Sequence, residues 1–96
     1  MSHMHFVVFA MDKPNHTEVR LANRPDHLEF LKANGDKIVY AGPMQSDDGE
    51  AMIGSMLVLD VADRAAAEAF AEADPYAKAG LFESTVIKRW KRVIPA

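Results

Sequence analysis

The order in which strand-like and helix-like segments follow one another most constrains the fold of this chain. The run from Phe6 to Ala10 is continuously apolar and rich in β-branched and aromatic residues, which is typical of a strand buried on both faces. Further strands are predicted at residues 37–41, 54–61 and 84–93. Helical patterns separate the first strand from the second and the third from the fourth. The order is therefore β-α-β-β-α-β, a ferredoxin-like arrangement of the α+β class.

The two helical segments have recognisable ends. The first stops before Asn34-Gly35, a common helix terminator, and is interrupted by Pro25. We therefore expect one helical turn around residues 18–22 and then a helix with Pro25 at its first position, two parts that could stack as one bent element. The second helix should begin after Asp63, whose side chain can cap the first turn, and should run through Ala73. Its predicted core-facing stripe is Ala66, Ala69, Phe70 and Ala73.

A single domain over residues 5–94 accounts for the whole pattern, because the chain has only 96 residues and no linker or repeat. Residues 1–4 are interpreted either as a cloning remnant ahead of a native start at Met4 or as a frayed terminus. At this length a core buries roughly 60 to 65% of the unfolded surface. Two helices cover one sheet face, which leaves the apolar side chains of the other face exposed. We expect a homodimer to form through that face.

Composition excludes several classes of function. The chain has no cysteine, so disulfides, thiolate metal sites and a cysteine nucleophile are ruled out. The net charge is −3, and the eleven Lys and Arg residues are scattered except for Lys88, Arg89, Lys91 and Arg92, so nucleic acid is not an expected partner. No apolar stretch is long enough to span a membrane and no secretory signal precedes the first strand, so a cytoplasmic protein is expected.

No metal or cofactor is predicted. His5 and His16 lack partners at metal-ligand spacing, and the acidic loop of residues 47–50 lacks the calcium-loop pattern. There is no Gly-rich phosphate loop or dinucleotide fingerprint. The strand residues Ser55 and Ser84 are not in a nucleophile-elbow sequence, so hydrolase chemistry has no support.

Three polar residues of the first helical segment could share one helix face. Arg20, Arg24 and His27 follow the i, i+4, i+7 spacing. Two guanidinium groups beside an imidazole can hold a substrate carboxylate or phenolate while the imidazole moves a proton. His27 would lie near the N-terminus of the helix that starts at Pro25, and the partial positive charge of that terminus would favour the neutral form of its imidazole. The alternative is solvated arginines and a locally packed histidine, and spacing alone favours that interpretation.

Other candidates have equally ordinary explanations. Asp74 follows the second helix, where its carboxylate faces the negative end of the helix dipole. It therefore needs a cationic or hydrogen-bonding partner there. Asp before Pro is, however, also a common turn signal. Gly42-Pro43 could leave a backbone group facing a pocket or could only stop a strand. Tyr76 could bond a substrate oxygen or lie at a subunit contact.

Three short motifs taken in order resemble the YCII-related (YciI-like) family. The motifs are R-P-x-H-L from Arg24 to Leu28, A-G-P at residues 41–43 and A-D-P-Y from Ala73 to Tyr76, together with the first strand and the Lys-Arg-Trp-Lys-Arg end. The resemblance covers nearly the whole chain. It implies a dimeric ferredoxin-like α/β barrel in which the residues matched by His27 and Asp74 form the active-site pair and Arg24 lines the same cavity.

The resemblance also implies a class of activity. The family is similar to muconolactone isomerase-like enzymes and includes a dehydrochlorinase that acts on a chlorinated hydroxyquinol. Our first hypothesis is an enzyme of lyase or isomerase type, in which His27 and Asp74 perform acid/base chemistry on a small anionic or phenolic substrate. Arg20, Arg24, Gly42-Pro43 and Tyr76 would contact that substrate. The second hypothesis is a non-catalytic module that binds a small molecule in the same pocket.

Overall fold

The computed structural model describes residues 4–95. The elements follow the predicted order, with two short helical turns, η1 and α3, added to it. Their bounds are β1 Met4–Asp12, α1 Thr17–Ala33, η1 Gly35–Lys37, β2 Ile38–Gln45, β3 Met52–Val61, α2 Arg64–Ala73, α3 Pro75–Lys78 and β4 Phe82–Trp90. Residues 1–3 of the segment interpreted as a remnant or frayed end lie outside the described residues, and Met4 is the first residue of β1.

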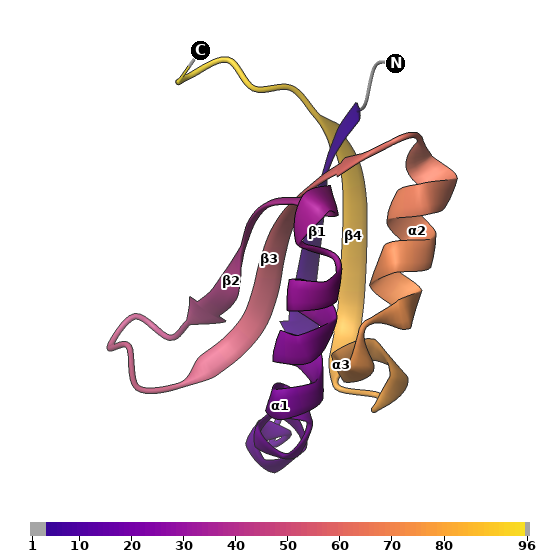
Figure 1. The fold of residues 1–96 in the computed structure, drawn as a ribbon. Helices are drawn as coiled ribbons and strands as arrows, with labels where there is room; N and C mark the ends of the chain where they lie inside the picture. Colours follow the sequence, from indigo (N-terminus) through magenta and orange to yellow (C-terminus); the bar gives the residue numbers. More distant parts are fainter. Residues whose placement is uncertain (1–3, 96) are drawn as a thin grey trace.

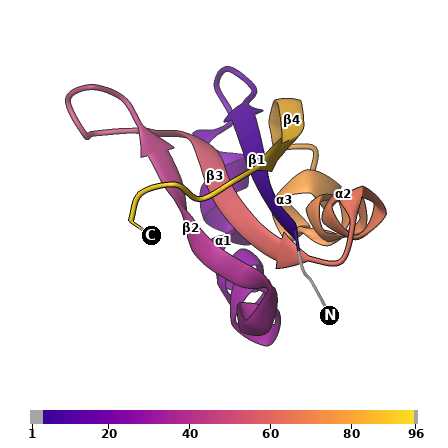
Figure 2. The ribbon, with the colours of Figure 1, turned by 90° about the horizontal axis from the view of Figure 1, so that it is seen from above.

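The four strands form one antiparallel sheet in the order β2-β3-β1-β4. Figures 1 and 2 show α1 and α2 lying side by side on the same face of this sheet. The first and third strands of the sequence are therefore central, and each helix connects two strands across the sheet. The predicted ferredoxin-like α+β fold is confirmed.

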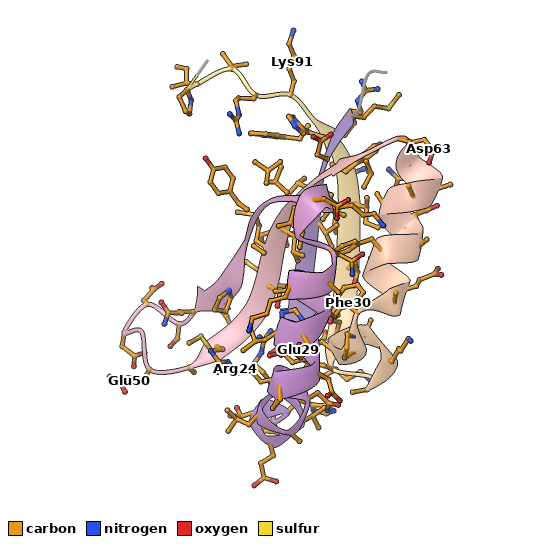
Figure 3. The ribbon with its side chains drawn as sticks, in the orientation of Figure 1. Arg24, Glu29, Phe30, Glu50, Asp63 and Lys91 are labelled. Atoms are coloured by element: carbon orange, nitrogen blue, oxygen red, sulfur yellow. The ribbon has the colours of Figure 1, made fainter. Side chains whose placement is uncertain are left out.

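The core lies between the sheet and the two helices. Period-two alternation sends every second residue of β1 and β3 toward the helices. The buried cluster contains Phe6, Val8, Leu57, Leu59 and Val61 from the sheet with Ala67 and Phe70 from α2. Phe30 of α1 reaches toward α2, where its ring lies 4.9 Å from that of Phe70 (Figure 3). Burying each large side chain contributes about 1.5–3 kcal/mol, so this layer holds the fold together.

The opposite face of the sheet has no helix over it. Phe9 of β1 pairs with Met56 of β3 on one side and with Val86 of β4 on the other, so these side chains are neighbours. Phe9, Met56 and Val86 keep 42%, 37% and 44% of their surface exposed, and Tyr40 of β2 keeps 56%. An apolar surface across β1, β3 and β4 is therefore left open, with Tyr40 exposed on β2, as the sequence predicts.

Pro25 lies inside α1 and not at its first position, so the predicted helix boundary was wrong. The helix runs without a break from Thr17 to Ala33. Proline removes the hydrogen bond to the carbonyl four residues earlier, which here belongs to Leu21. Both Pro25 and Leu21 are exposed, so water can satisfy that carbonyl.

Two further details differ from the prediction. β2 continues through Gly42-Pro43 to Gln45, with Pro43 paired to Ser55. Proline is tolerated because β2 is an edge strand, where one side of the backbone needs no partner. In α2 the buried residues are Ala67 and Phe70, while Ala69 is exposed. The buried face of the helix is therefore turned slightly from the predicted one, which included Ala69 but not Ala67. The predicted Asp63 cap is confirmed, since its carboxylate accepts from the Ala66 amide.

Candidate active site

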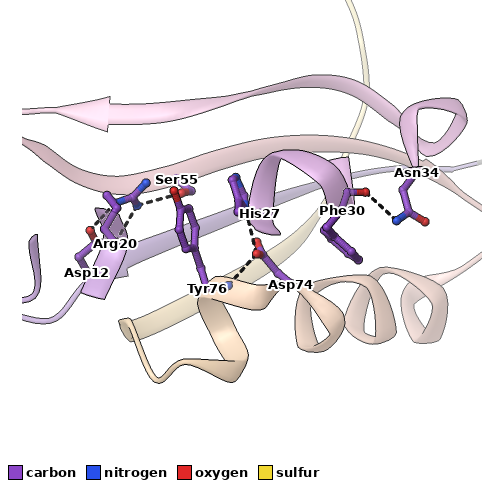
Figure 4. A network of polar contacts seen from close by, with 8 residues as sticks. All are labelled: Asp12, Arg20, His27, Phe30, Asn34, Ser55, Asp74 and Tyr76. Carbon is purple, nitrogen blue, oxygen red and sulfur yellow. Dashed lines mark hydrogen bonds and ion pairs between the residues drawn. The ribbon is translucent and has the colours of Figure 1, made fainter. Parts of the chain in front are cut away.

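A histidine and an aspartate meet between α1 and the α2–α3 corner. Nδ1 of His27 lies 2.8 Å from Oδ1 of Asp74, and both side chains are buried (Figure 4). Because a carboxylate accepts, Nδ1 carries the proton of this bond, and neutral imidazole is then unprotonated at Nε2. Among residues 4–95 Nε2 has no hydrogen-bond partner.

Backbone geometry fixes Asp74 in place. The residue ends α2 and caps α3, and its Oδ1 also accepts from the Tyr76 amide at 2.9 Å. Pro75 follows at the first position of α3, where a missing N–H costs nothing. The hydrogen bonds that a carboxylate at this helix end needs are thus supplied by one imidazole and one amide.

The middle of α1 supplies His27, so the predicted benefit of a nearby helix N-terminus was wrong. α1 begins at Thr17, and the effect of a helix dipole falls off within the first turn. Asp74, not the helix terminus, therefore orients the imidazole.

Tyr76 lies against both the histidine and an arginine. Its ring stacks on the His27 imidazole with centroids 3.9 Å apart at 15°, and the Arg20 guanidinium carbon lies 4.6 Å from the ring centroid. Figure 4 shows the tyrosine ring between these two groups. Burial raises the pKa of Tyr76, while the charges of Arg20 and Arg24 act in the opposite direction. Tyr76 is thus a neutral, fixed wall of the site.

Arg20 is engaged by the protein itself. Its Nε and Nη2 donate to the two oxygens of Asp12 at 2.7 and 2.9 Å, and Nη2 also donates to Ser55 Oγ at 3.0 Å. Burial opposes the charge of Arg20, but the Asp12 carboxylate outweighs it and raises the pKa of the guanidinium further. Arg20 therefore stays charged, and its charge is already matched by Asp12.

A cavity of about 370 Å³ opens between α1 and the edge of the sheet. Six of the seven predicted site residues line it, namely Arg20, Arg24, His27, Gly42, Pro43 and Tyr76. Asp74 does not line it and lies behind the imidazole. The remaining wall is mostly apolar and comes from Leu21, Leu28, Leu31, Ala41 and Met52, with Ser55. A pocket with apolar walls and a few converging polar groups is typical of a small-molecule site.

Arg24 differs from Arg20 in its surroundings. It is exposed and lies on the side of α1 that faces β2 and β3 (Figure 3). Within residues 4–95 it forms no ion pair. Arg24 is therefore the cation of this cavity whose charge is available to a ligand.

Asp12 and Ser55 were missed as site residues by sequence reasoning. Asp12 ends β1 and Ser55 lies within β3, so they are 8 and 35 residues from the arginine that joins them. The one signal for Asp12 is indirect: an arginine buried on a helix requires a carboxylate partner. That signal depends on knowing that Arg20 is buried.

The described residues offer no comparable second centre. In the range 4–95 no three His, Asp or Glu side chains gather closely enough to hold a metal ion. A hollow of about 480 Å³ between α1 and α2 has a wall of alanine, phenylalanine and valine with four polar residues at one end, Asn34, Asp36, Lys37 and Asp60, and no histidine lines it. None of the helices within 4–95 has the length and apolar character needed to cross a membrane.

Known proteins resemble this chain in sequence and fold. The chain is 38% identical to protein YciI of Escherichia coli O6:H1 over 94% of its own length and 99% of that protein, and 35% identical to an uncharacterized protein of Haemophilus influenzae with the same coverage. A solved structure is also similar, that of 5-chloro-2-hydroxyhydroquinone dehydrochlorinase (TftG) from Burkholderia phenoliruptrix AC1100 in complex with 2,5-dihydroxybenzoquinone. Its sequence is 34% identical to this one, and the two folds superpose with a TM-score of 0.87 over 94% of this chain and 96% of that one.

A more distant structure shares the fold alone. Rv0793 from Mycobacterium tuberculosis has a TM-score of 0.55 at 16% identity, over 99% of both chains. The YCII-related domain matches residues 4–91 of this chain, which include both members of the His27–Asp74 pair. The resemblance inferred from the three motifs is thereby confirmed, and the chain belongs to the YCII-related family.

Proposed function

We propose that this protein is an enzyme that performs acid/base chemistry, an elimination or an isomerisation, on a small anionic or phenolic substrate. The observation that carries the proposal is the 2.8 Å contact between His27 Nδ1 and Asp74 Oδ1 behind a cavity that the same imidazole lines. A buried carboxylate that holds one ring nitrogen leaves the other nitrogen to exchange a proton with a bound molecule.

In this mechanism His27 Nε2 takes a proton from a hydroxyl or an activated C–H of the substrate. The electron pair released by that bond either expels a leaving group, as in elimination, or shifts a double bond, as in isomerisation. Asp74 keeps Nδ1 protonated and stabilises the imidazolium that forms. In isomerisation the proton returns to another atom, and in elimination it leaves with the departing group.

Arg24 would hold the anionic oxygen of the substrate. Its guanidinium has no ion-pair partner among the described residues, whereas Arg20 is held by Asp12. We therefore assign Arg24 to binding and Arg20 to support of Tyr76 and Ser55. Gly42-Pro43 forms part of the opposite wall, where the lack of a large side chain leaves room for a ligand.

The structural neighbour supports this class of reaction. That protein is a dehydrochlorinase and binds 2,5-dihydroxybenzoquinone, a small ring with several oxygens. Loss of HCl from a chlorinated, hydroxylated ring requires a base for the proton and neutral or cationic groups near the oxygens. The cavity here offers both kinds of group, in His27 and Arg24.

We also propose a homodimer that forms through the open sheet face. Phe9, Met56 and Val86 form its centre, because β1 and β3 lie in the middle of the sheet. An apolar surface of this kind is stabilised when a second copy removes it from water.

The test is turnover of oxygenated ring compounds by His27→Ala, with 5-chloro-2-hydroxyhydroquinone as the first compound and chloride release as the measurement. We expect a loss of roughly 100-fold or more, because a positioned general base contributes about that factor. The matched control is His16→Ala, since the His16 ring lies outside the cavity and hydrogen-bonds the Pro14 carbonyl at the surface. Circular dichroism would show that both variants keep the fold.

Two results would decide against the enzyme. Full activity in His27→Ala on a compound that the native protein converts would remove the assigned base. A ligand that raises the melting temperature but is recovered chemically unchanged would instead favour the second hypothesis, a non-catalytic binding module.

A further inference from the structure

Ser55 is a polar residue of the cavity to which the proposed mechanism gives no task. It lies in β3, keeps only 3% of its surface exposed and lines the same cavity as His27. Its Oγ accepts a hydrogen bond from Arg20 Nη2 at 3.0 Å. The Ser55 hydroxyl can also donate its own proton, and this hydrogen bond needs an acceptor.

Arg20 cannot turn away from Ser55 without losing other bonds. Asp12 binds Nε and Nη2 with both carboxylate oxygens, which fixes the plane of the guanidinium. The remaining Nη2 proton is then directed at Ser55 Oγ, since a planar guanidinium has donors in fixed directions. Ser55 thus acts as an acceptor toward the protein side of the site.

The Ser55 hydroxyl is left as a donor without an acceptor among residues 4–95. A buried hydroxyl whose proton finds no acceptor is costly, and native structures seldom leave one unsatisfied. The cavity lies directly beside this hydroxyl. An oxygen atom of a bound molecule is the acceptor that would satisfy it.

We infer that Ser55 is a specificity-determining residue that donates a hydrogen bond to an oxygen of the ligand. The inference rests on the proposed small-molecule site and narrows its ligand class. The ligand carries at least two oxygens, one paired with the Arg24 charge and one accepting from Ser55, while His27 exchanges the proton. A hydroxylated quinone or polyphenol fits this pattern, and a ring with a single polar group does not.

The test compares two substituted rings, 2,5-dihydroxy-1,4-benzoquinone, which carries four oxygens, and 2,5-dimethylphenol, whose single oxygen cannot serve Arg24 and Ser55 together. Calorimetric dissociation constants give the preference of the native protein for the quinone probe. Ser55→Ala should reduce that preference about 10-fold, the effect of one lost hydrogen bond. The chain has no cysteine, so quinones find no thiol to react with.

The controls separate binding from support of the fold. Ser84→Ala removes an exposed hydroxyl of β4 that does not line the cavity, and it should leave the preference unchanged. Ser55→Thr keeps a hydroxyl group and should retain most of the preference for the quinone probe. If Ser55→Ala folds poorly, this second variant still tests the inference.

Equal weakening of both probes in Ser55→Ala would mean that Ser55 only supports Arg20, and this would overturn the inference. The inference would also be overturned if the native protein bound neither of the two probes. The inference is tested by binding and the proposed catalysis by turnover. A preference lost in Ser55→Ala together with turnover retained in His27→Ala would therefore refute the catalysis and leave the inference standing.

Discussion

Both faces of the sheet carry large apolar side chains, but their surroundings differ. On one face Phe6 and Leu59 are almost completely buried beneath α1 and α2. On the other, Phe9 and Met56 come from the same two strands and keep about two-fifths of their surface exposed. Every polar residue of the candidate site lies on the covered side. The covered face therefore contributes the stability and the site, while the open face is suited to association.

The largest expected difference between the faces is in stability. Leu59→Ala should lower the free energy of unfolding by about 2–5 kcal/mol, because Leu59 is fully buried and its removal leaves a cavity. Met56→Ala changes the same strand on the open face and should cost the dissociated protomer about 1 kcal/mol or less, because Met56 keeps 37% of its surface exposed there. Urea unfolding of both variants in a Phe9→Lys background, in which the proposed dimer is dissociated, measures both values. Equal costs would show that the open face is already packed within the protomer.

A charge placed on the open face tests association. Phe9→Lys should raise the dissociation constant of the proposed dimer by at least about 100-fold, because an ammonium group would be buried without a partner. The protomer should remain folded, since Phe9 lies outside the buried cluster. Sedimentation velocity over a range of concentrations measures this effect.

The matched control for that experiment is Leu21→Lys. Leu21 is 62% exposed on α1, far from the open face, so this change should leave association intact. A native protein that sediments as a monomer at micromolar concentration would refute the proposed dimer.

The smallest expected effect concerns the two tyrosines, one on each side of the sheet. Burial raises the pKa of Tyr76 above its ordinary value of 10.0, against the opposing charges of Arg20 and Arg24. Because the folded pKa is the higher one, the neutral phenol adds stability that is present below about pH 10 and is lost as the pH rises through the folded value.

Absorbance of the phenolate measures this shift. In Tyr40→Phe the remaining tyrosine is Tyr76, which should ionise above pH 10, and its ionisation should coincide with a fall in stability. Tyr76→Phe should not show that stability loss. Ionisation of Tyr76 below pH 10 would mean that the arginine charges outweigh burial.

Most of the fold could be predicted from local patterns. Apolar runs, Asn34-Gly35 and Asp63 mark strands and helix ends through short-range chemistry that the sequence carries directly. The errors at Pro25 and Pro43 have one common cause. Each proline is tolerated because the backbone group it leaves unpaired faces solvent or a sheet edge, and that position is known only after the chain has folded.

The site was predictable in part. Residue spacing placed Arg20, Arg24 and His27 on one helix face, and these three do line a common cavity. Spacing could not join His27 to Asp74, which is 47 residues away, and only the family resemblance linked them. The pairing of Arg20 with Asp12 was invisible for the same physical reason: contacts between distant segments are set by packing.

One oxygen atom of Asp74 serves two structural elements at once. Oδ1 accepts from the Tyr76 amide, in the first turn of α3, and from the imidazole of His27. Any local opening of the α2–α3 corner therefore also releases the histidine. The rate of hydrogen exchange at the Tyr76 amide would report how often this opening occurs. One backbone amide therefore measures the fraction of molecules in which the His27–Asp74 pair is intact.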